Sequence, residues 1–160
     1  MRLSVLAVGR LKAGPEKFLA EDYRTRAENL GRKAGISRLT VANITESQGQ
    51  TAAARKAEEA RFFAAAVPPK AFTIVLDERG KLLTSLDFAA QLRRHIDGGT
   101  ADLAFLIGGP DGHAAATREK ADMLLSFGPM TWPHRLMRVM LFEQIYRAVT
   151  IMVNHPYHRP

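Results

Sequence analysis

The chain has 160 residues, of which 46% are hydrophobic and 24% charged, a composition typical of a folded globular protein and not of a disordered one. It contains no cysteine, which excludes disulfide bonds and thiolate metal sites. A formal net charge of +7, spread along the chain, favours a polyanionic partner such as nucleic acid, with an inert basic surface as the alternative.

The length and the opening residues set expectations for organisation and location. The chain has the size of one domain, so we expect a single domain over residues 1–160. The apolar run after Arg2 ends at Gly9, too early for a secretory signal, and a buried strand explains it better. No apolar run approaches the roughly 20 residues needed to cross a bilayer. We therefore expect a cytoplasmic protein.

The first 50 residues predict a strand, a helix and a second strand. Residues 2–8 form an apolar run typical of a strand buried on both faces. Pro15 suits the first turn of a helix, which we expect Gly31 to close. Residues 36–44 alternate imperfectly between apolar and polar, which predicts another strand, and residues 45–50 are polar and predict a loop.

The middle of the chain continues this alternation. An Ala-rich helix is predicted over residues 51–66, with Thr51 as a possible N-cap and two prolines after its end. Residues 71–76 predict the third strand, which the polar residues 77–80 should end. A helix capped by Thr84 or Ser85 is predicted to run through residue 96.

The last third of the chain contains two more predicted strands and two predicted helices. Residues 102–107, DLAFLI, are apolar after Asp102 and predict the fourth strand, followed by the sharp loop 108–112. A polar helix is then expected to about residue 123, a short strand over residues 124–127 and a long helix over residues 133–153. Strands alternating with helices predict an α/β fold, a mostly parallel sheet with helices on both faces.

Three loops at one edge of this predicted sheet are unusual in composition. In open α/β sheets ligands bind beyond the carboxyl ends of the strands, which here means the loops after Leu76, Ile107 and Phe127. The glycine pair in residues 108–112 allows close approach of the backbone to a ligand, although such a sequence is often only a turn. It matches neither the dinucleotide fingerprint nor the P-loop, so neither ligand class is indicated.

The last predicted helix suggests a buried cation and a second subunit. On a helical wheel Arg138 lies within the apolar face, where its guanidinium needs a carboxylate, an array of carbonyls or an anionic ligand. Glu143, Gln144 and Arg147 share another arc. Most of the remaining circumference is apolar, more than a helix on a small sheet requires, so we expect a homodimer.

The C-terminal residues are rich in groups that bind RNA. His155, Tyr157 and His158 can stack on unstacked bases, and Arg159 can hold a phosphate, although a frayed tail is the usual state of a chain end. Metal binding by the two histidines is a weaker interpretation, because no third ligand is evident.

Several segments together resemble the SPOUT-type methyltransferases that modify a pseudouridine in 23S rRNA, the RlmH family. The stretches that carry the resemblance are LSVLAVGRLK, TIVLDERGK, FLIGGPDG, LSFGPMTWPHRLMRVMLFEQIYRA and NHPYHR. The resemblance implies a C-terminal trefoil knot, an exception to the rule that chains do not thread their own loops, and a homodimer.

The same resemblance implies a cofactor and a set of site residues. The cofactor is S-adenosylmethionine, and its carried-over contacts fall on Leu76, Gly108, Phe127, Gly128, Pro129, Met130, Thr131 and Trp132. The reaction is methylation of N3 of a pseudouridine in 23S rRNA of the large ribosomal subunit, within either the subunit or the assembled ribosome. Candidate catalytic residues are Arg138, His155, Tyr157 and His158.

Two other functions fit the sequence less well. A non-catalytic RNA-binding module would use the same basic surface without a cofactor, and S-adenosylmethionine binding separates it from an enzyme. A nucleotide-binding regulatory protein would bind ATP or NAD, but it lacks either phosphate motif. No metal and no membrane are expected as partners.

Overall fold

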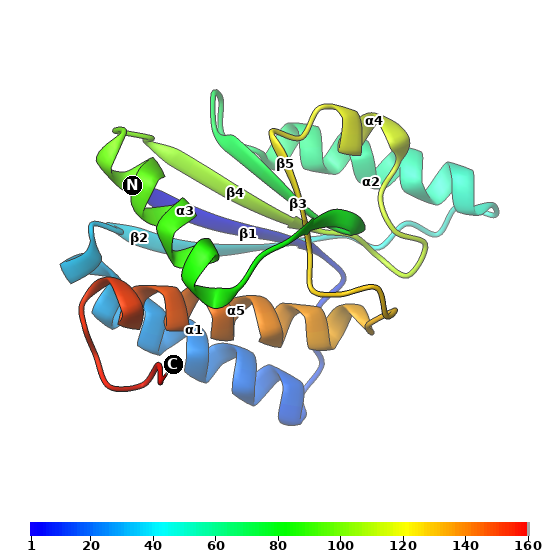
Figure 1. Cartoon of the computed structure of the whole chain (residues 1–160). Coiled ribbons are helices and arrows are strands. Elements are labelled where there is room, and N and C mark those ends of the chain that lie inside the picture. The colour runs from blue at the N-terminus through cyan, green and yellow to red at the C-terminus, as the bar shows by residue number, and fades with distance from the viewer. Residues whose placement is uncertain (160) are drawn as a thin grey trace.

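Parallel strands form the central sheet of the computed structural model, which describes residues 1–159 (Figure 1). The sheet has 5 strands in the order β2-β1-β4-β3-β5, and every pairing is parallel. This confirms the predicted α/β class. The strands are β1 (Arg2–Val8), β2 (Arg38–Ile44), β3 (Phe72–Leu82), β4 (Asp102–Ile107) and β5 (Met123–Ser126).

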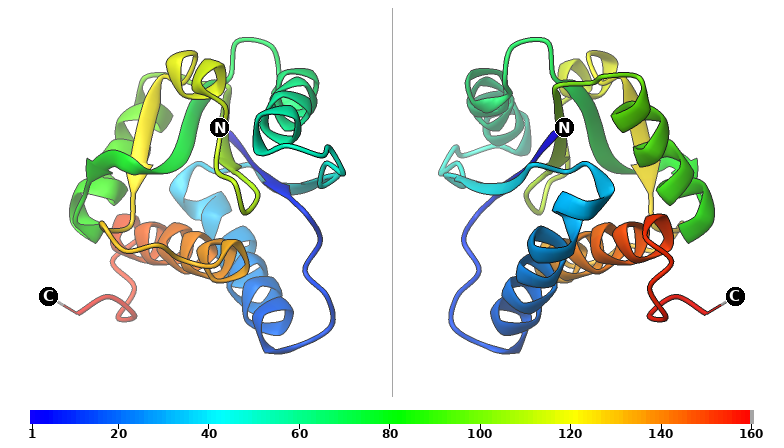
Figure 2. Two further views of the ribbon diagram at one scale, coloured as in Figure 1. Left: turned by 90° about the vertical axis from the view of Figure 1, so that its right-hand side faces the viewer. Right: turned by 90° about the vertical axis from the view of Figure 1, so that its left-hand side faces the viewer.

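Helices cover both faces of the sheet, as expected (Figure 2). They are α1 (Pro15–Ala34), α2 (Ala52–Ala66), α3 (Ser85–Asp97), α4 (Ala115–Glu119) and α5 (His134–Met152). The larger core packs α1, α3 and α5 against one face, and the smaller core packs Phe63 of α2 against the other. Alternate strand residues enter the two cores: Val5 and Phe105 face the larger, Leu6 and Leu106 the smaller. The strands are therefore apolar on both faces.

Helix ends follow the predicted chemistry with two exceptions, one of which is the short polar helix, where α4 ends at Glu119 and not near residue 123. The Thr51 hydroxyl accepts a hydrogen bond from the Ala54 amide at 3.1 Å, and Thr84 forms a capping box with Asp87. The prediction that Gly31 ends α1 is wrong. The helix continues to Ala34, and Gly35 ends it in a left-handed conformation with φ 95°. Gly31 is instead a buried helical residue that packs against Ile36.

Strand β3 runs beyond its predicted end at residue 76. Leu76 and Lys81 both pair with Leu125 of β5, so the four residues between them loop out and the chain returns to the same partner strand. Because most residues of this extension are polar, its pairing with the distant β5 could not be recognised from the local sequence. Gly80 lies so close to β5 that a Cβ there would be 2.5 Å from the carbonyl carbon of Leu125. The trefoil knot itself stays a prediction.

Helix α5 is covered within its own chain to a greater extent than its sequence suggests. All of its residues from Met137 onward are at least partly buried, because α1 and α3 flank it beneath the sheet (Figure 1). The apolar circumference of this helix therefore does not by itself require a second subunit. Support for a homodimer must come from other surfaces of the chain.

Candidate functional site

A cavity of about 610 Å³ lies at the carboxyl edge of the sheet, where residues 77–79, which loop out of β3, meet the loops after β4 and β5. Its volume is within the range of small-molecule sites. Of the residues expected to contact the cofactor, all but Pro129 line it: Leu76, Gly108, Phe127, Gly128, Met130, Thr131 and Trp132. Segments far apart in sequence thus converge on one hollow, as expected for an open α/β sheet.

The glycine-rich loop after β4 forms the floor of this cavity. A Cβ at Gly108 would lie 3.1 Å from Nε2 of His113 and 3.2 Å from the carbonyl carbon of Gly112. The loop folds back on itself, and the Gly112 amide donates to the Gly109 carbonyl at 3.0 Å. A side chain at position 108 would therefore be crowded, and the bare glycine backbone lines the cavity.

The loop between β5 and α5 forms the opposite wall. Ser126 shapes its start, because its hydroxyl donates to the Gly128 carbonyl at 3.0 Å and accepts from the Gly128 amide at 3.1 Å. Gly128 has φ 119°, a conformation that favours glycine. Beyond it, Met130 is 69% exposed and Trp132 38% exposed. This wall is thus open, with large apolar side chains available to a ligand.

Charged side chains of both signs surround the mouth of the cavity. Lys56, Arg79, Arg118 and His134 line it together with Asp77, Glu78 and Asp111. The Asp77 carboxylate accepts the Arg79 amide at 3.0 Å and lies 3.8 Å from the Arg118 guanidinium. Burial lowers the pKa of His134, which favours its neutral form. Cations that can hold phosphate therefore stand beside a neutral imidazole.

Both terminal nitrogens of the buried Arg138 guanidinium have partners within the chain, whereas its Nε has none among the described residues. Its side chain is 3% exposed and donates to Asn43 Oδ1 at 2.8 Å, the Gly9 carbonyl at 2.9 Å and the Val8 carbonyl at 3.2 Å. The partner of the guanidinium is thus an array of oxygens around the end of β1. Such an array is one of the three kinds of partner that the sequence allowed. Arg138 is not among the residues that line the cavity of its own chain, and its hydrogen bonds join α5 to the ends of β1 and β2.

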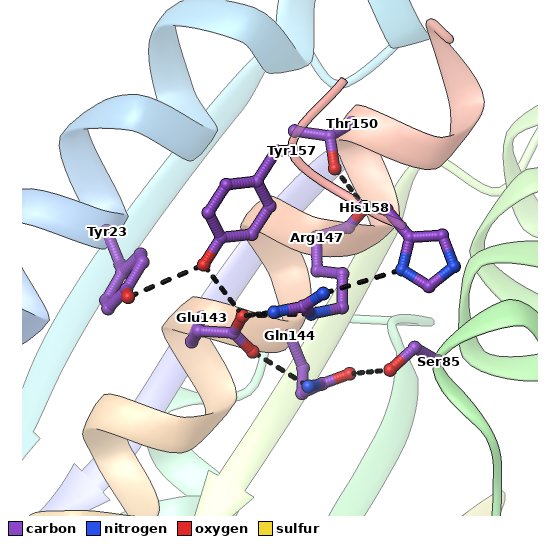
Figure 3. Close-up of polar contacts among 8 residues, drawn as sticks. All are labelled: Tyr23, Ser85, Glu143, Gln144, Arg147, Thr150, Tyr157 and His158. Carbon is purple, nitrogen blue, oxygen red and sulfur yellow. Dashed lines mark hydrogen bonds and ion pairs between the residues drawn. The ribbon is translucent and has the colours of Figure 1, made fainter. Parts of the chain in front are cut away.

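The C-terminal tail folds back on α5 and α1 (Figure 3). The Tyr157 hydroxyl donates to Glu143 Oε1 at 2.9 Å and lies 3.5 Å from the Tyr23 hydroxyl. The Arg147 guanidinium stands 4.8 Å from the centre of the Tyr157 ring and binds Glu143, and its Nη1 lies 3.5 Å from Nδ1 of His158. Burial raises the pKa of the Tyr157 hydroxyl, which therefore remains protonated as a donor.

This tail cluster stands apart from the cavity. None of His155, Tyr157 and His158 lines the hollow of their own chain. Nε2 of His158 is buried without a partner among the described residues, whereas His155 is exposed and accepts the Tyr157 amide at 3.2 Å on Nδ1. Within residues 1–159 no group of three side chains is placed to hold a metal, and no helix has the length and hydropathy of a membrane span.

Comparison with known proteins places the chain in a family. A family model described as "Predicted SPOUT methyltransferase" matches residues 1–158. The chain belongs to the SPOUT methyltransferases. It is 54% identical to Ribosomal RNA large subunit methyltransferase H of Rhodopseudomonas palustris strain HaA2 over 99% of both chains. It is 50% identical to the protein of that name from Bradyrhizobium sp. strain ORS 278, over 99% of this chain and 98% of that one.

A solved structure shares the fold at low sequence identity. A probable methyltransferase from Bordetella pertussis Tohama I superposes with a TM-score of 0.50 and 12% identity, covering 92% of this chain and 95% of that one. The likeness supports the SPOUT fold alone. Membership of the family confirms the expected enzyme class, a methyltransferase that uses S-adenosylmethionine.

The cavity of this SPOUT protein fits that cofactor. S-adenosylmethionine combines a flat purine with polar ribose and amino-acid groups. The apolar side chains of Leu76, Ile107 and Phe127 suit the purine, and the glycine backbone at residues 108 and 128 offers close polar contact. Only Pro129 among the expected contacts lies outside the lining, and its nitrogen has no hydrogen to donate.

His113 is a residue of this SPOUT cavity that sequence reasoning missed. It is 4% exposed, packs 5.4 Å from the Phe63 ring, and neither ring nitrogen has a hydrogen-bond partner among the described residues. Burial lowers its pKa to about 4, with Asp77 as the main opposing influence. A histidine next to a glycine loop gives no periodic signal, so only the fold reveals that it is buried.

His113 should make folding stability depend on pH. The His113 imidazole is protonated near pH 6.5 in the unfolded chain and only near pH 4 in the folded chain. The free energy of unfolding therefore has its full value above pH 6.5 and falls as the pH drops from 6.5 to 4. The difference between the two pKa values corresponds to roughly 3 kcal/mol of folding free energy. Urea unfolding at several pH values should show that His113→Leu removes this part of the acid sensitivity. An unchanged pH profile in the variant would contradict the burial of a neutral imidazole.

Proposed function

We propose that this protein methylates N3 of a pseudouridine in 23S rRNA of the large ribosomal subunit. The observation that carries the proposal is the convergence of the three strand-end loops on one cavity that suits S-adenosylmethionine. Relatives at 50–54% identity named for methylation of large-subunit ribosomal RNA support the substrate. We further propose that the chain acts as one domain with a knotted C-terminal half, in the cytoplasm, where ribosomes are made.

Catalysis in this proposal consists of positioning and proton removal. S-adenosylmethionine supplies an electrophilic methyl group when bound, and the chain must hold the imide nitrogen in line with it. Lys56, Arg79 and Arg118 at the cavity mouth would hold RNA phosphates. The imide must also lose its proton, for which we propose His155 or His158, with Tyr157 stacked on the base. Arg138 supports this arrangement by fixing the end of β1.

The tail residues need a second copy of the chain to reach a cavity. A groove of about 560 Å³ lies between α1, α3 and α5 and shares Phe127 and Gly128 with the cofactor cavity. Exposed apolar side chains gather on the elements around it: Phe18 at 72%, Leu19 at 42%, Leu82 at 69% and Leu86 at 55% exposure. Such a patch is typical of an interface. We propose a homodimer seated on this groove, in which the tail of one copy lies near the cavity of the other.

A charge in this groove should separate the subunits. Sedimentation equilibrium at micromolar concentration is expected to show a dimer for the wild type and a monomer for Leu82→Lys, because the ammonium group would have to be buried against the second copy. Methyl transfer should be lost with the dimer. Phe62→Lys, at a residue 44% exposed on α2 outside the groove, is the matched control and should remain dimeric. A strictly monomeric wild type would contradict the proposal.

The proposed reaction is tested with ribosomes from a strain that lacks this protein. Purified protein and S-adenosylmethionine should add one methyl group to a pseudouridine of 23S rRNA, located by mass spectrometry of the digested RNA. Free 23S rRNA, large subunits and whole ribosomes are compared as substrates. If calorimetry showed saturable binding of S-adenosylmethionine but none of these RNAs were methylated, the cofactor site would stand and the proposed substrate would be wrong.

A further inference from the structure

Glu59 is a buried carboxylate directly beneath the glycine-rich loop. Its side chain belongs to α2 and is 5% exposed. The backbone amides of Ser47 and Gly109 lie near its carboxylate and lower its pKa, but burial raises that pKa by more. The two amides come from the loops after β2 and β4, so one carboxylate joins two strand-end loops to α2.

The loop rests on this carboxylate without space between them. A Cβ at Gly109 would lie 3.1 Å from Glu59 Oε1, 3.3 Å from Oε2 and 3.1 Å from Cγ1 of Val8. The backbone at position 109 is therefore fixed from below by Glu59 and by strand β1. Gly108, which lines the cavity, is the preceding residue.

Arg55 holds the other end of the same loop. Its guanidinium donates to both carboxylate oxygens of Asp111, at 2.6 Å and 3.1 Å, and to the Gly49 carbonyl at 2.9 Å. Both side chains of this ion pair are less than one-third exposed, at 30% and 28%. A bidentate pair of this kind fixes direction as well as distance. The loop is thus held at positions 109 and 111, on both sides of Pro110.

We propose that Glu59 and Arg55 are positioning residues that pre-form the glycine-rich loop for the methyl donor, an inference that rests on the proposed function. Glu59 is not among the residues that line the cavity, and it acts through Gly109. A loop that is already ordered before binding loses less conformational entropy when the ligand arrives. Helix α2 therefore contributes to cofactor affinity from outside the cavity.

The test compares cofactor binding with the state of the Gly109 amide. In Glu59→Gln a neutral amide replaces the carboxylate beside Gly109, so the backbone N–H there loses its interaction with a charged acceptor. We expect calorimetry with S-adenosylhomocysteine to show affinity weakened about tenfold, the size of one lost polar interaction with a charged group. The Gly109 amide resonance should move upfield in the ¹⁵N-HSQC spectrum. Arg55→Gln should weaken binding in the same direction and leave that resonance in place.

Glu58→Gln is the matched control. Glu58 is the neighbouring exposed glutamate of α2, and its carboxylate accepts the Ser47 hydroxyl and no loop amide at position 109. Its variant should bind the ligand as the wild type does. If Glu59→Gln and Arg55→Gln both kept wild-type affinity, the inference would be overturned while the proposed function stood. A wild type that does not bind would overturn the proposed function itself.

A purely structural role would give a different pattern. In that case Glu59→Gln would lower the melting temperature of the protein but not change the dissociation constant measured well below that temperature. Should Glu59→Gln fail to fold, Arg55→Gln, at a more exposed pair, decides the matter alone. Unchanged affinity in that variant would count against the proposal.

Discussion

A Gly80→Val variant is expected to lose about 3 kcal/mol or more of folding free energy, or to fail to fold. A Cβ at this position would lie 2.5 Å from the Leu125 carbonyl carbon and 2.6 Å from that of Leu124. These atoms belong to the backbone of β5 where it pairs with β3, so they cannot move aside as a flexible side chain would. The variant should therefore separate β3 from β5 where both border the cofactor cavity.

Chemical denaturation measures this loss, with Gly31→Ala as the control. Gly31 is also buried, but a Cβ there would meet the Ile36 Cβ at 3.4 Å, an ordinary contact, and alanine favours a helix. We expect that variant to be as stable as the wild type or slightly more stable. If Gly80→Val were equally stable, the close approach of β3 to β5 would be wrong, and with it the shape of the cavity where these two strands border it.

The sequence predicted the strands and helices well wherever local chemistry determines them. Strand β4 begins and ends where its apolar run does, and Thr51 and Thr84 cap the helices that follow them. Prediction failed for the end of β3, because residues 77–80 are polar and loop out, and Lys81 and Leu82 then pair with β5, which lies about 40 residues further along the chain. Pairing between distant segments leaves no local periodicity.

The candidate site was predictable to a similar degree. The glycines and strand ends located the cavity, since bare backbone at a carboxyl edge has a physical use. The supporting side chains were not predictable. Glu59 and His113 resemble an ordinary helical glutamate and a loop histidine in sequence, and only folding buries them beside residues 108 and 109. Arg138 was correctly predicted to be buried, but its oxygen partners come from β1 and β2.

In the proposed homodimer, the cofactor cavity of one chain and the tail cluster of the other form one shared site. The cavity contains the groups that suit a methyl donor, whereas the aromatic and imidazole groups suited to the base lie on the tail, outside the hollow of their own chain. The groove that shares Phe127 and Gly128 with the cavity is where a second copy would bring the two sets together. Binding and transfer should therefore respond differently to changes in the tail.

Glu143→Ala should reduce methyl transfer by about a hundredfold or more while S-adenosylmethionine affinity stays within about twofold of the wild type. Glu143 Oε1 accepts from Tyr157 and Arg147, and Oε2 accepts from Gln144 at 2.7 Å, so the carboxylate is the centre of the tail cluster (Figure 3). Without it the Arg147 guanidinium and the Tyr157 hydroxyl lose their shared acceptor, and the tail is no longer held on α5.

Single-turnover methylation and calorimetry on the same preparation separate transfer from binding. Glu28→Ala is the matched control, since Glu28 pairs with Arg24 at the same i,i+4 spacing on the outer face of α1, and it should change neither quantity. A His155→Ala, His158→Ala double variant should show the same split as Glu143→Ala, because the imidazoles that the tail carries are the proposed proton acceptors. Full transfer rates in both tail variants would mean that the base lies elsewhere, and His134, already within the cavity lining, would be the group to change next.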